Sequence, residues 1–392
     1  MKPNPQAGMT LVEIMVALTL GLILLGGVMA VFETQTRTNS STVAQSAIQD
    51  EQNAIAALVI PVIRGAGFLG CAGVSLATSD VTATVPPPLG TLKTVRAAVY
   101  GYDYAGTAGT GSAYAMGTDN VANDSSTGHW SPALDASFMS PAAVVEPGSD
   151  VVVVLGAVRS AYPVTLPASS PFSATVNNLP AIPVSNYPVS PPTQSYAFPA
   201  YGALSTCNMA EVFAVDSNPA TPTVNSSSAD YSSAVQCAAK GNGGCAGIFT
   251  AGAAQSAQYV PVGQTAFFVG QGASGESALM QASLLNPSES GKTWTVTPLV
   301  PGVEFMQVLY GIGALSPVTG VLTANQYVPA GSVMSWGSVV SIRLGFLLEG
   351  EPGSAPVGQG NSWTVLGTTV TVPQDTRLRH VFEMTVNLRN SI

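Results

Sequence analysis

An uncharged stretch of 19 residues, residues 14–32, limits what this chain can fold into more than any other feature of its sequence. Its length is close to the ~20 apolar residues that a helix needs to cross the hydrocarbon core of a membrane. A short polar leader with one positive charge, Lys2, precedes the stretch and ends at Gly8. The N-terminus therefore predicts a membrane helix, a signal for export, or both.

Three interpretations of this N-terminus compete. In the first, the stretch is a secretory signal peptide, and Val28-Met29-Ala30 offers small residues for a cleavage site. In the second, it is an ordinary single-pass anchor. In the third, a peptidase cleaves the chain on the cytoplasmic side of the stretch, after Gly8, so that the apolar residues stay in the mature protein.

Glu13 favours the third interpretation. A carboxylate at the edge of a membrane helix is costly and therefore indicates a function, which neither a signal peptide nor a plain anchor requires. After cleavage at Gly8, the mature chain begins at Met9 and Glu13 is its fifth residue. The new α-amino group of one subunit can then pair with Glu13 of a neighbouring subunit inside the membrane.

The residues after the apolar stretch predict that the helix continues. Polar residues 33–42 are followed by apolar residues at three- and four-residue steps up to Val62, which is typical of an amphipathic helix. Because proline interrupts the helical hydrogen bonds and disfavours helix in the residue before it, we expect the helix to end near Ile60, before Pro61.

We expect four parts: a leader at 1–8, a membrane half of the helix at 9–32, an amphipathic half at 33–62, and a β-rich extracytoplasmic domain at 63–392. Only 8% of the residues are charged, and the chain has 40 Gly and 29 Pro, which favours short strands joined by turns over a helical bundle. An inserted subdomain within 78–290 is compatible with the long Pro-, Ser- and Thr-rich stretches there. The predicted fold class is α+β, with a long N-terminal helix packed on a large, mostly antiparallel head.

Apolar runs bounded by Gly, Pro, Asn or Ser predict the strands of this head. The predicted strands are Val151–Leu155, Val212–Val215, Ala266–Val269, Val303–Tyr310, Val339–Leu348, Val365–Val372 and Val381–Leu388. Residues 270–275 spell G-x-G-x-x-G after one of them, but a nucleotide site outside the cytoplasm would lack its ligand, so a hairpin turn is favoured. The aromatic run Tyr100-Gly101-Tyr102-Asp103-Tyr104 predicts either a contact surface or aromatic residues that are buried or lie on an edge strand.

Charge and motif content exclude several classes of function. The net charge is −9 and the 12 basic residues are scattered, whereas a nucleic-acid-binding face needs a basic stripe. Two histidines, His129 and His380, leave little for acid–base catalysis, and neither G-x-S-x-G nor H-E-x-x-H is present. We therefore expect no enzymatic activity, no bound metal and no cofactor.

The N-terminal motif resembles that of the type IV pilin superfamily. The residues Gly8-Met9-Thr10-Leu11-Val12-Glu13 are similar to the prepilin processing motif, although Phe is the usual first mature residue where this chain has Met9. The resemblance implies cleavage after Gly8 by a prepilin peptidase and N-methylation of Met9. It also assigns Glu13 to pairing between subunits.

Three further segments resemble PilW-type minor pilins. They are Ile63–Cys71, directly after the helix, Val300–Gly311, which contains a glycine-bearing strand motif, and Arg379–Asn390, which resembles the C-terminal strand. The resemblance implies a minor pilin that acts in initiation or at the tip of a type IV pilus. Its implied partners are the other minor and major pilins and the assembly platform of the inner membrane.

The implied location is the inner membrane, with a single span and the C-terminal domain in the periplasm, followed by incorporation into a pilus on the cell surface. Two alternatives remain open. One is a J-type minor pseudopilin of type II secretion, which shares the leader and the helix. The other is a β-rich adhesin exported by a signal peptide.

Four cysteines, Cys71, Cys207, Cys237 and Cys245, predict two disulfides, because a domain carried past the inner membrane enters an oxidising compartment. Four cysteines allow three pairings, among which the sequence does not choose. We favour Cys237 with Cys245, which closes a short Gly-rich loop, and Cys71 with Cys207, which ties the end of the helix to the sheet. A zinc site is disfavoured because no C-x-x-C pair is present.

Overall fold

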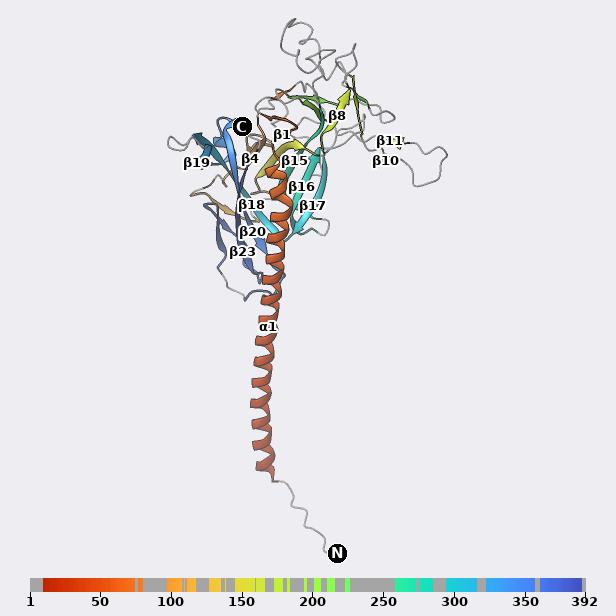
Figure 1. The fold of residues 1–392 in the computed structure, drawn as a ribbon. Helices are drawn as coiled ribbons and strands as arrows, with labels where there is room; N and C mark the ends of the chain where they lie inside the picture. Colours follow the sequence, from red (N-terminus) through yellow and green to blue (C-terminus); the bar gives the residue numbers. More distant parts are fainter. Residues whose placement is uncertain are drawn as a thin grey trace.

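The structure is a computed structural model. It describes residues 10–74, 77–79, 97–107, 109, 111–117, 127–134, 138, 145–158, 160–165, 173–178, 182–183, 194–195, 201–205, 210–215, 223–225, 258–272, 275–284, 294–315, 322–356 and 360–389. One α-helix, α1 (Leu11–Arg64), is followed in this part of the chain by a β-rich head (Figure 1).

The strands of the described residues are β1 (Phe68–Leu69), β2 (Ala72–Gly73), β3 (Ala77–Ser79), β4 (Val99–Tyr104), β5 (Ala113–Ala115), β6 (Trp130–Ser131), β7 (Val151–Ala157), β8 (Tyr162–Thr165), β9 (Ser173–Val176), β10 (Ile182–Pro183), β11 (Gln194–Ser195), β12 (Tyr201–Ser205), β13 (Ala210–Ala214), β14 (Thr223–Asn225), β15 (Gln258–Gln271), β16 (Ser277–Leu284), β17 (Thr295–Pro301), β18 (Val303–Leu315), β19 (Leu322–Val328), β20 (Val339–Glu349), β21 (Ser362–Val365), β22 (Thr368–Thr371) and β23 (Arg379–Asn387). Short 3₁₀ turns lie at η3 (Thr127–His129), η4 (Ala330–Ser332) and η5 (Trp336–Ser338).

Two sheets form the body of the head. The larger is a twelve-stranded sheet whose long central strand, β15, pairs antiparallel with β7, β12 and β16, and β17 forms an edge beyond β16. The smaller is antiparallel, in the order β19-β18-β20-β23. Parallel pairing is confined, in the described residues, to β13 with β3 and β22 with β5. The predicted α+β class with a mostly antiparallel head is therefore confirmed.

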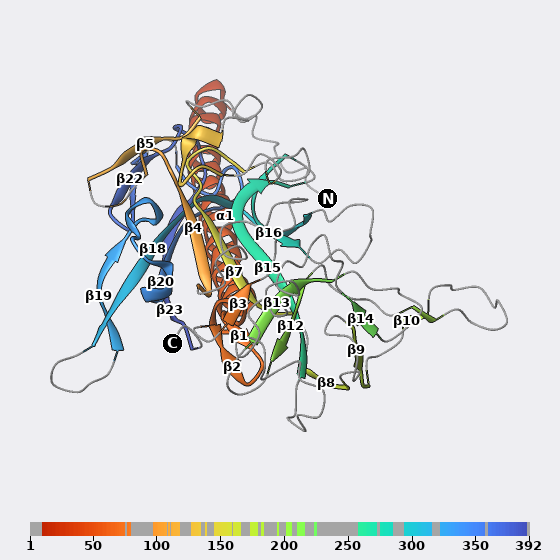
Figure 2. The same ribbon diagram turned by 90° about the horizontal axis from the view of Figure 1, so that it is seen from above.

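Helix α1 lies where the two sheets meet. It contacts β23 of the smaller sheet and β17 of the larger one, and the view from above places it between the two sheets (Figure 2). Its buried side chains recur along one face, at Ala44, Ile48, Ile55, Val59 and Ile63. Burying one such large aliphatic side chain stabilises a fold by roughly 1.5–3 kcal/mol, so the upper half of α1 is held firmly to the head.

The prediction that the helix ends before Pro61 is wrong by about one turn. Helix α1 continues to Arg64, and the N–H of Gly65 closes it with a hydrogen bond to the carbonyl of Pro61 at 3.0 Å. Pro61 removes only its own N–H from the helical ladder. The last turn is retained because Val59 and Ile63, which are 1% and 0% exposed, pack into the core.

Six of the seven predicted strands lie within the observed strands β7, β13, β15, β18, β20 and β23, to within one residue at their ends. The seventh, Val365–Val372, is wrong, because this segment turns back on itself as the hairpin of β21 and β22. Its two turn residues, Leu366 and Gly367, have φ angles of 45° and 93°. Two successive positive φ angles are characteristic of the tightest hairpin turns, in which leucine is unusual.

The glycine-rich segment at residues 270–275 joins β15 to β16, which pair antiparallel. The N–H of Gly272 bonds to the carbonyl of Glu276 at 2.7 Å across this connection. Ala273 and Ser274 lie outside the described residues. The segment is therefore the turn of a hairpin, as predicted, and not a loop that leads into a helix.

Candidate assembly interface

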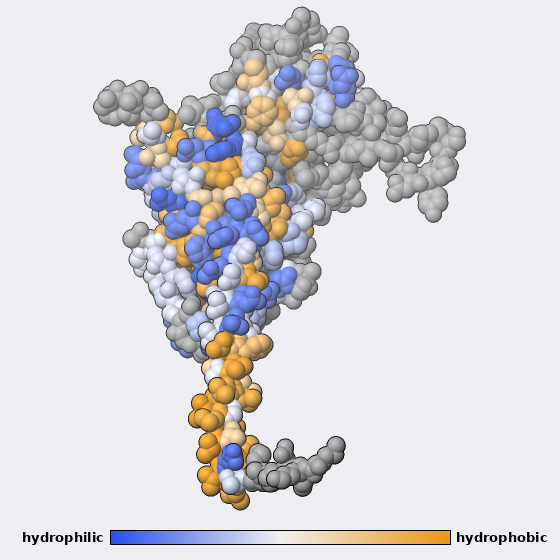
Figure 3. Space-filling model, turned by 60° about the horizontal axis from the view of Figure 1, so that its bottom comes forward, coloured by the Kyte–Doolittle hydropathy of each residue, from blue (hydrophilic) through white to orange (hydrophobic). Residues whose placement is uncertain are grey.

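The lower half of α1 projects from the head with its apolar side chains bare. From Leu11 to Phe32 the large apolar residues are exposed to between 44% and 75% of their surface. Figure 3 shows these side chains gathered on the projecting rod. This length and composition suffice to cross a membrane, and so large an apolar surface requires lipid or another protein to cover it.

Glu13 lies in the first turn of this projecting helix. Thr10 precedes the helix in an extended conformation, and its hydroxyl oxygen accepts a hydrogen bond from the Glu13 N–H at 3.4 Å. A threonine cap and an acidic side chain both stabilise a helix N-terminus. Glu13 thus has a local role in the helix besides the predicted pairing. Gly8 and Met9 lie outside the described residues, so cleavage after Gly8 and pairing with the new N-terminus remain predictions.

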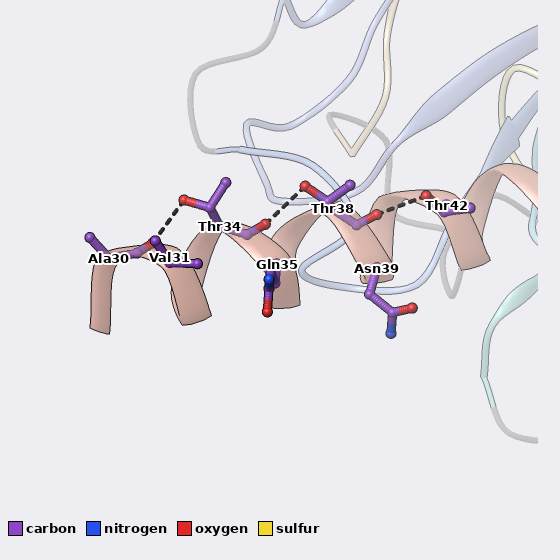
Figure 4. Close-up of a pocket in the computed structure, with 7 residues that line it drawn as sticks. All are labelled: Ala30, Val31, Thr34, Gln35, Thr38, Asn39 and Thr42. Carbon is purple, nitrogen blue, oxygen red and sulfur yellow. Dashed lines mark hydrogen bonds between the residues drawn. The ribbon is translucent and has the colours of Figure 1, made fainter. Parts of the chain in front are cut away.

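A shallow groove of about 600 Å³ follows α1 just beyond the apolar residues (Figure 4). Three threonine hydroxyls on one line of the helix donate hydrogen bonds to carbonyl oxygens one turn earlier: Thr34 to Ala30 at 2.8 Å, Thr38 to Thr34 at 2.9 Å and Thr42 to Thr38 at 2.9 Å. Val31, Gln35 and Asn39 also line the groove. The side chains of Gln35 and Asn39 point away from the line of threonines.

A second cleft, of about 580 Å³, separates α1 from the base of the head. Its helical wall runs from Arg37 to Gln45, and its other wall is formed by Gly353–Pro356 with Thr376. The hydroxyl of Ser40 spans the gap with a hydrogen bond to the carbonyl of Gly353 at 3.1 Å. The head therefore touches the helix lightly here, and close packing begins one turn further on, at Ala44.

Ionic contacts fix the base of the smaller sheet. The guanidinium of Arg379, which is 6% exposed, donates to both carboxylate oxygens of Glu304 at 2.6 and 2.8 Å, and to both oxygens of Asp375 at 2.7 and 2.8 Å. Arg377 contacts Glu349 at 3.2 Å. The hydrogen bond from Arg379 lowers the pKa of Asp375, whereas burial and then the neighbouring Glu304 raise the pKa of Glu349 to about 8.

Glu51 brings a further carboxylate from α1 to this region. One of its oxygens, Oε1, lies beside Gly302 in the turn between β17 and β18, and the other, Oε2, is buried without a hydrogen-bond partner in the described residues. Burial, and to a smaller extent the charge of Glu351, raises the pKa of Glu51 to about 7.

Asp150 connects the two sheets, a role that the sequence analysis did not identify. Its carboxylate accepts hydrogen bonds from the backbone N–H of Tyr104 at 2.9 Å, on the larger sheet, and of Val308 at 2.8 Å, on the smaller. Asp103, also buried, accepts one from the N–H of Gly331 at 3.1 Å. Burial and the charge of Asp103 raise the pKa of Asp150 well above its usual value. The one feature of the sequence that could have identified this role is the position of an acidic residue directly before an all-apolar strand.

The aromatic run on β4 is mainly internal. Tyr102 and Tyr104 are each 4% exposed, and Tyr100 is half-buried. Of the two alternatives for this run, buried strand residues are correct. Gly101 lies against the hydroxyl of Tyr310, which is why this position has no side chain.

Cys71 is disulfide-bonded. Cys207, Cys237 and Cys245 lie outside the described residues, so the two pairings remain predictions. In the part of the chain that the structure describes, no three His, Cys, Asp or Glu side chains gather in a way that would hold a metal ion. His129 lies beside Tyr104, and His380 is exposed on β23.

Comparisons with known proteins find matches in the N-terminal and C-terminal parts of the chain. Residues 3–29 match the prokaryotic N-terminal methylation motif, and residues 266–390 match the family described as Type IV Pilus-assembly protein W. The chain is therefore a type IV pilin-like protein that carries a prepilin methylation motif. The second match runs from within β15 to just beyond β23, so this C-terminal third of the chain is similar to PilW-type pilins.

One solved structure, the Type IV-like pilin TTHA1219 from Thermus thermophilus, is 20% identical to this chain over a match that covers 33% of this chain and 69% of that one. Its TM-score of 0.20 is too low to carry an argument about this fold. No curated protein matches the chain significantly.

Proposed function

We propose that this protein is a minor pilin that acts in the initiation or at the tip of a type IV pilus. The observation that carries the proposal is the bare apolar half of α1, with Glu13 in its first turn, attached to a head of more than 300 residues. A major subunit would have to repeat this large head along the whole fibre, whereas a tip position needs room for one.

In this proposal a prepilin peptidase removes residues 1–8, and Met9 becomes the methylated N-terminus. The subunit then waits in the inner membrane with its head in the periplasm until the assembly platform moves it into a filament. There α1 packs against the helices of other minor and major pilins, and Glu13 sets the register by pairing with a neighbouring N-terminus. The protein itself carries out no catalytic step and binds no nucleic acid.

The first test is to identify the start of the mature protein by mass spectrometry of the purified chain. A start at N-methyl-Met9 supports the proposal, and a start near Val31 would remove it in favour of an exported adhesin. Deletion of the gene followed by a count of surface pili then tests the role in initiation. Normal piliation, together with a loss of protein secretion, would favour the J-type pseudopilin of type II secretion.

The second test is the substitution Glu13→Gln, which keeps the size of the side chain and removes its charge. We expect normal processing at Gly8 and a loss of incorporation into pili. Glu33→Gln is the matched control, because Glu33 is exposed on the same helix beyond the apolar residues and forms a surface ion pair with Arg37 at 2.6 Å. Equal incorporation of the two variants would contradict the pairing role of Glu13.

A further inference from the structure

The part of α1 between the membrane and the head has little to stabilise it. In this polar segment, defined as residues 33–42, every residue is exposed except Ser40 and Ser41, which are half-exposed. Below it, the apolar residues have lipid or other helices to cover them. Above it, the helix is packed on the head from Ala44 onward. The polar segment therefore depends mainly on its own helical stability.

The composition of the polar segment makes that stability low. Seven of the nine residues at 34–42 are Thr, Ser or Asn. Each is on the order of two- to threefold less favourable in a helix than Ala, because β-branched side chains lose rotamer freedom and short polar ones compete for the backbone. Together these seven residues lower the equilibrium constant for helix formation in the segment by several hundredfold relative to an all-alanine helix.

The hydroxyl groups of the segment already engage its backbone. Besides the three threonines of the groove, Thr36 donates to the carbonyl of Phe32 at 2.9 Å. The single proton of the Ser40 hydroxyl is shared between the carbonyls of Arg37 at 3.0 Å and Gly353 at 3.1 Å. Hydroxyls that bond to carbonyls three or four residues earlier weaken and often bend helices. They also give these carbonyls a second donor, so that the helix can open at this place without leaving its carbonyls unsatisfied.

The head leaves room for such a movement. The cleft of about 580 Å³ lies directly beside the upper part of the polar segment, and the Ser40–Gly353 hydrogen bond is a slight tether. Among the residues that the structure describes, Arg37 forms an ion pair with Glu33 on its own helix and none with the head. Because α1 runs 26 residues beyond Thr38, or about 39 Å, a bend of about 20° at that residue displaces its far end by about 13 Å.

We propose that residues 33–42 are a hinge about which the head turns relative to the membrane half of α1, and that the cleft beside it opens and closes with this movement. The observations that carry the proposal are the weak composition, the exposure, the hydroxyl bonds to the backbone and the cleft. It requires only that α1 is anchored at its lower end, so it does not rest on a role in pilus initiation.

Hydrogen–deuterium exchange of the full chain in detergent micelles tests the stability of the segment. We expect backbone amides at 35–44 to exchange at least 100-fold faster than those at 48–60, in the packed half of the helix. Replacing three threonines together, as T34A/T36A/T38A, raises the helix equilibrium about threefold at each position and should slow exchange in the segment by on the order of 25-fold.

The matched control is S46A/Q49A/N53A, three substitutions at exposed positions in the packed half of the same helix. This control should leave exchange at 35–44 unchanged. Equal protection of the two halves in the unmodified protein would overturn the proposal, and this comparison does not depend on any variant folding.

The movement itself is measured with genetically encoded spin labels at Leu22 and Thr323, which are both exposed. A hinge gives a broad distribution of distances that narrows in T34A/T36A/T38A and stays broad in S46A/Q49A/N53A. A narrow distribution in the unmodified protein, or the same width in both variants, would show that the head and the membrane half move as one rod.

Discussion

Replacing Glu146 with glutamine is expected to stabilise the protein at pH 7.5 and to change its stability little at pH 5. Glu146 is 8% exposed, and it accepts a hydrogen bond from the hydroxyl of Ser277 at 2.9 Å. Burial, with a further contribution from the charge of Glu304, raises its pKa from 4.5 to about 7. The folded protein therefore binds a proton at Glu146 more tightly than the unfolded chain does.

The sign and size of the effect follow from this difference. A carboxyl group whose pKa is raised by folding adds stability that is complete below its unfolded pKa and is lost as the pH rises through its folded pKa. Here the window runs from about pH 4.5 to pH 7. The rise of about 2.5 pH units corresponds to about 3 kcal/mol of unfolding free energy, and glutamine, which resembles the protonated acid, keeps this contribution at every pH.

Urea unfolding of the full chain in detergent, at pH 7.5 and pH 5, measures the difference. We expect the free energy of unfolding of E146Q to exceed that of the unmodified protein by about 3 kcal/mol at pH 7.5 and by less than about 1 kcal/mol at pH 5. The control is E276Q, because Glu276 is exposed in the nearby β15–β16 hairpin and its replacement should change the free energy of unfolding by less than about 0.5 kcal/mol. A glutamine variant that is less stable at pH 7.5, or an equal difference at both pH values, would refute the reasoning.

Two further substitutions test the packing of the head. Gly101→Ala should destabilise the fold by about 1–3 kcal/mol in thermal unfolding, because the new methyl group overlaps the buried Tyr310 hydroxyl; a neutral result would mean that β4 can shift. Arg379→Met should lower the free energy of unfolding by about 3–5 kcal/mol at pH 7.5, since it leaves Glu304 and Asp375 without their shared cation. A loss of less than about 1 kcal/mol would contradict the stabilising role of this cation.

The features that local pattern determines were predictable from the sequence. The apolar stretch and the three- and four-residue periodicity predicted α1, and β-branched apolar runs predicted strands such as Val151–Leu155. Both signals come from residues close together in the chain. The prepilin motif is equally local, because its six residues, Gly8–Glu13, are consecutive in the chain. This is why the sequence alone identified Glu13 as a candidate.

The errors arise where contacts between distant segments override local preference. Pro61 would end an isolated helix, but the burial of Ile63 in the head keeps the last turn. Leu366 is a poor turn residue, yet the pairing of β22 with β5 and of β21 with β22 requires a tight turn there. The role of Asp150 could not be predicted, because its two backbone partners are separated from it by 46 and 158 positions in the sequence.

The distribution of charge along α1 gives its two halves different mechanical roles. Only 8% of the residues in this chain are charged, yet the carboxylate of Glu51 on the helix is buried beside Gly302, in the turn between β17 and β18. The apolar side chains of the upper half, from Ala44 to Ile63, pack on the head and fix the helix to it in one orientation. Residues 33–42 have neither apolar packing nor buried charge. A stiff junction directly above a weak segment confines bending to that segment, so that the head moves as one body with the upper half of α1.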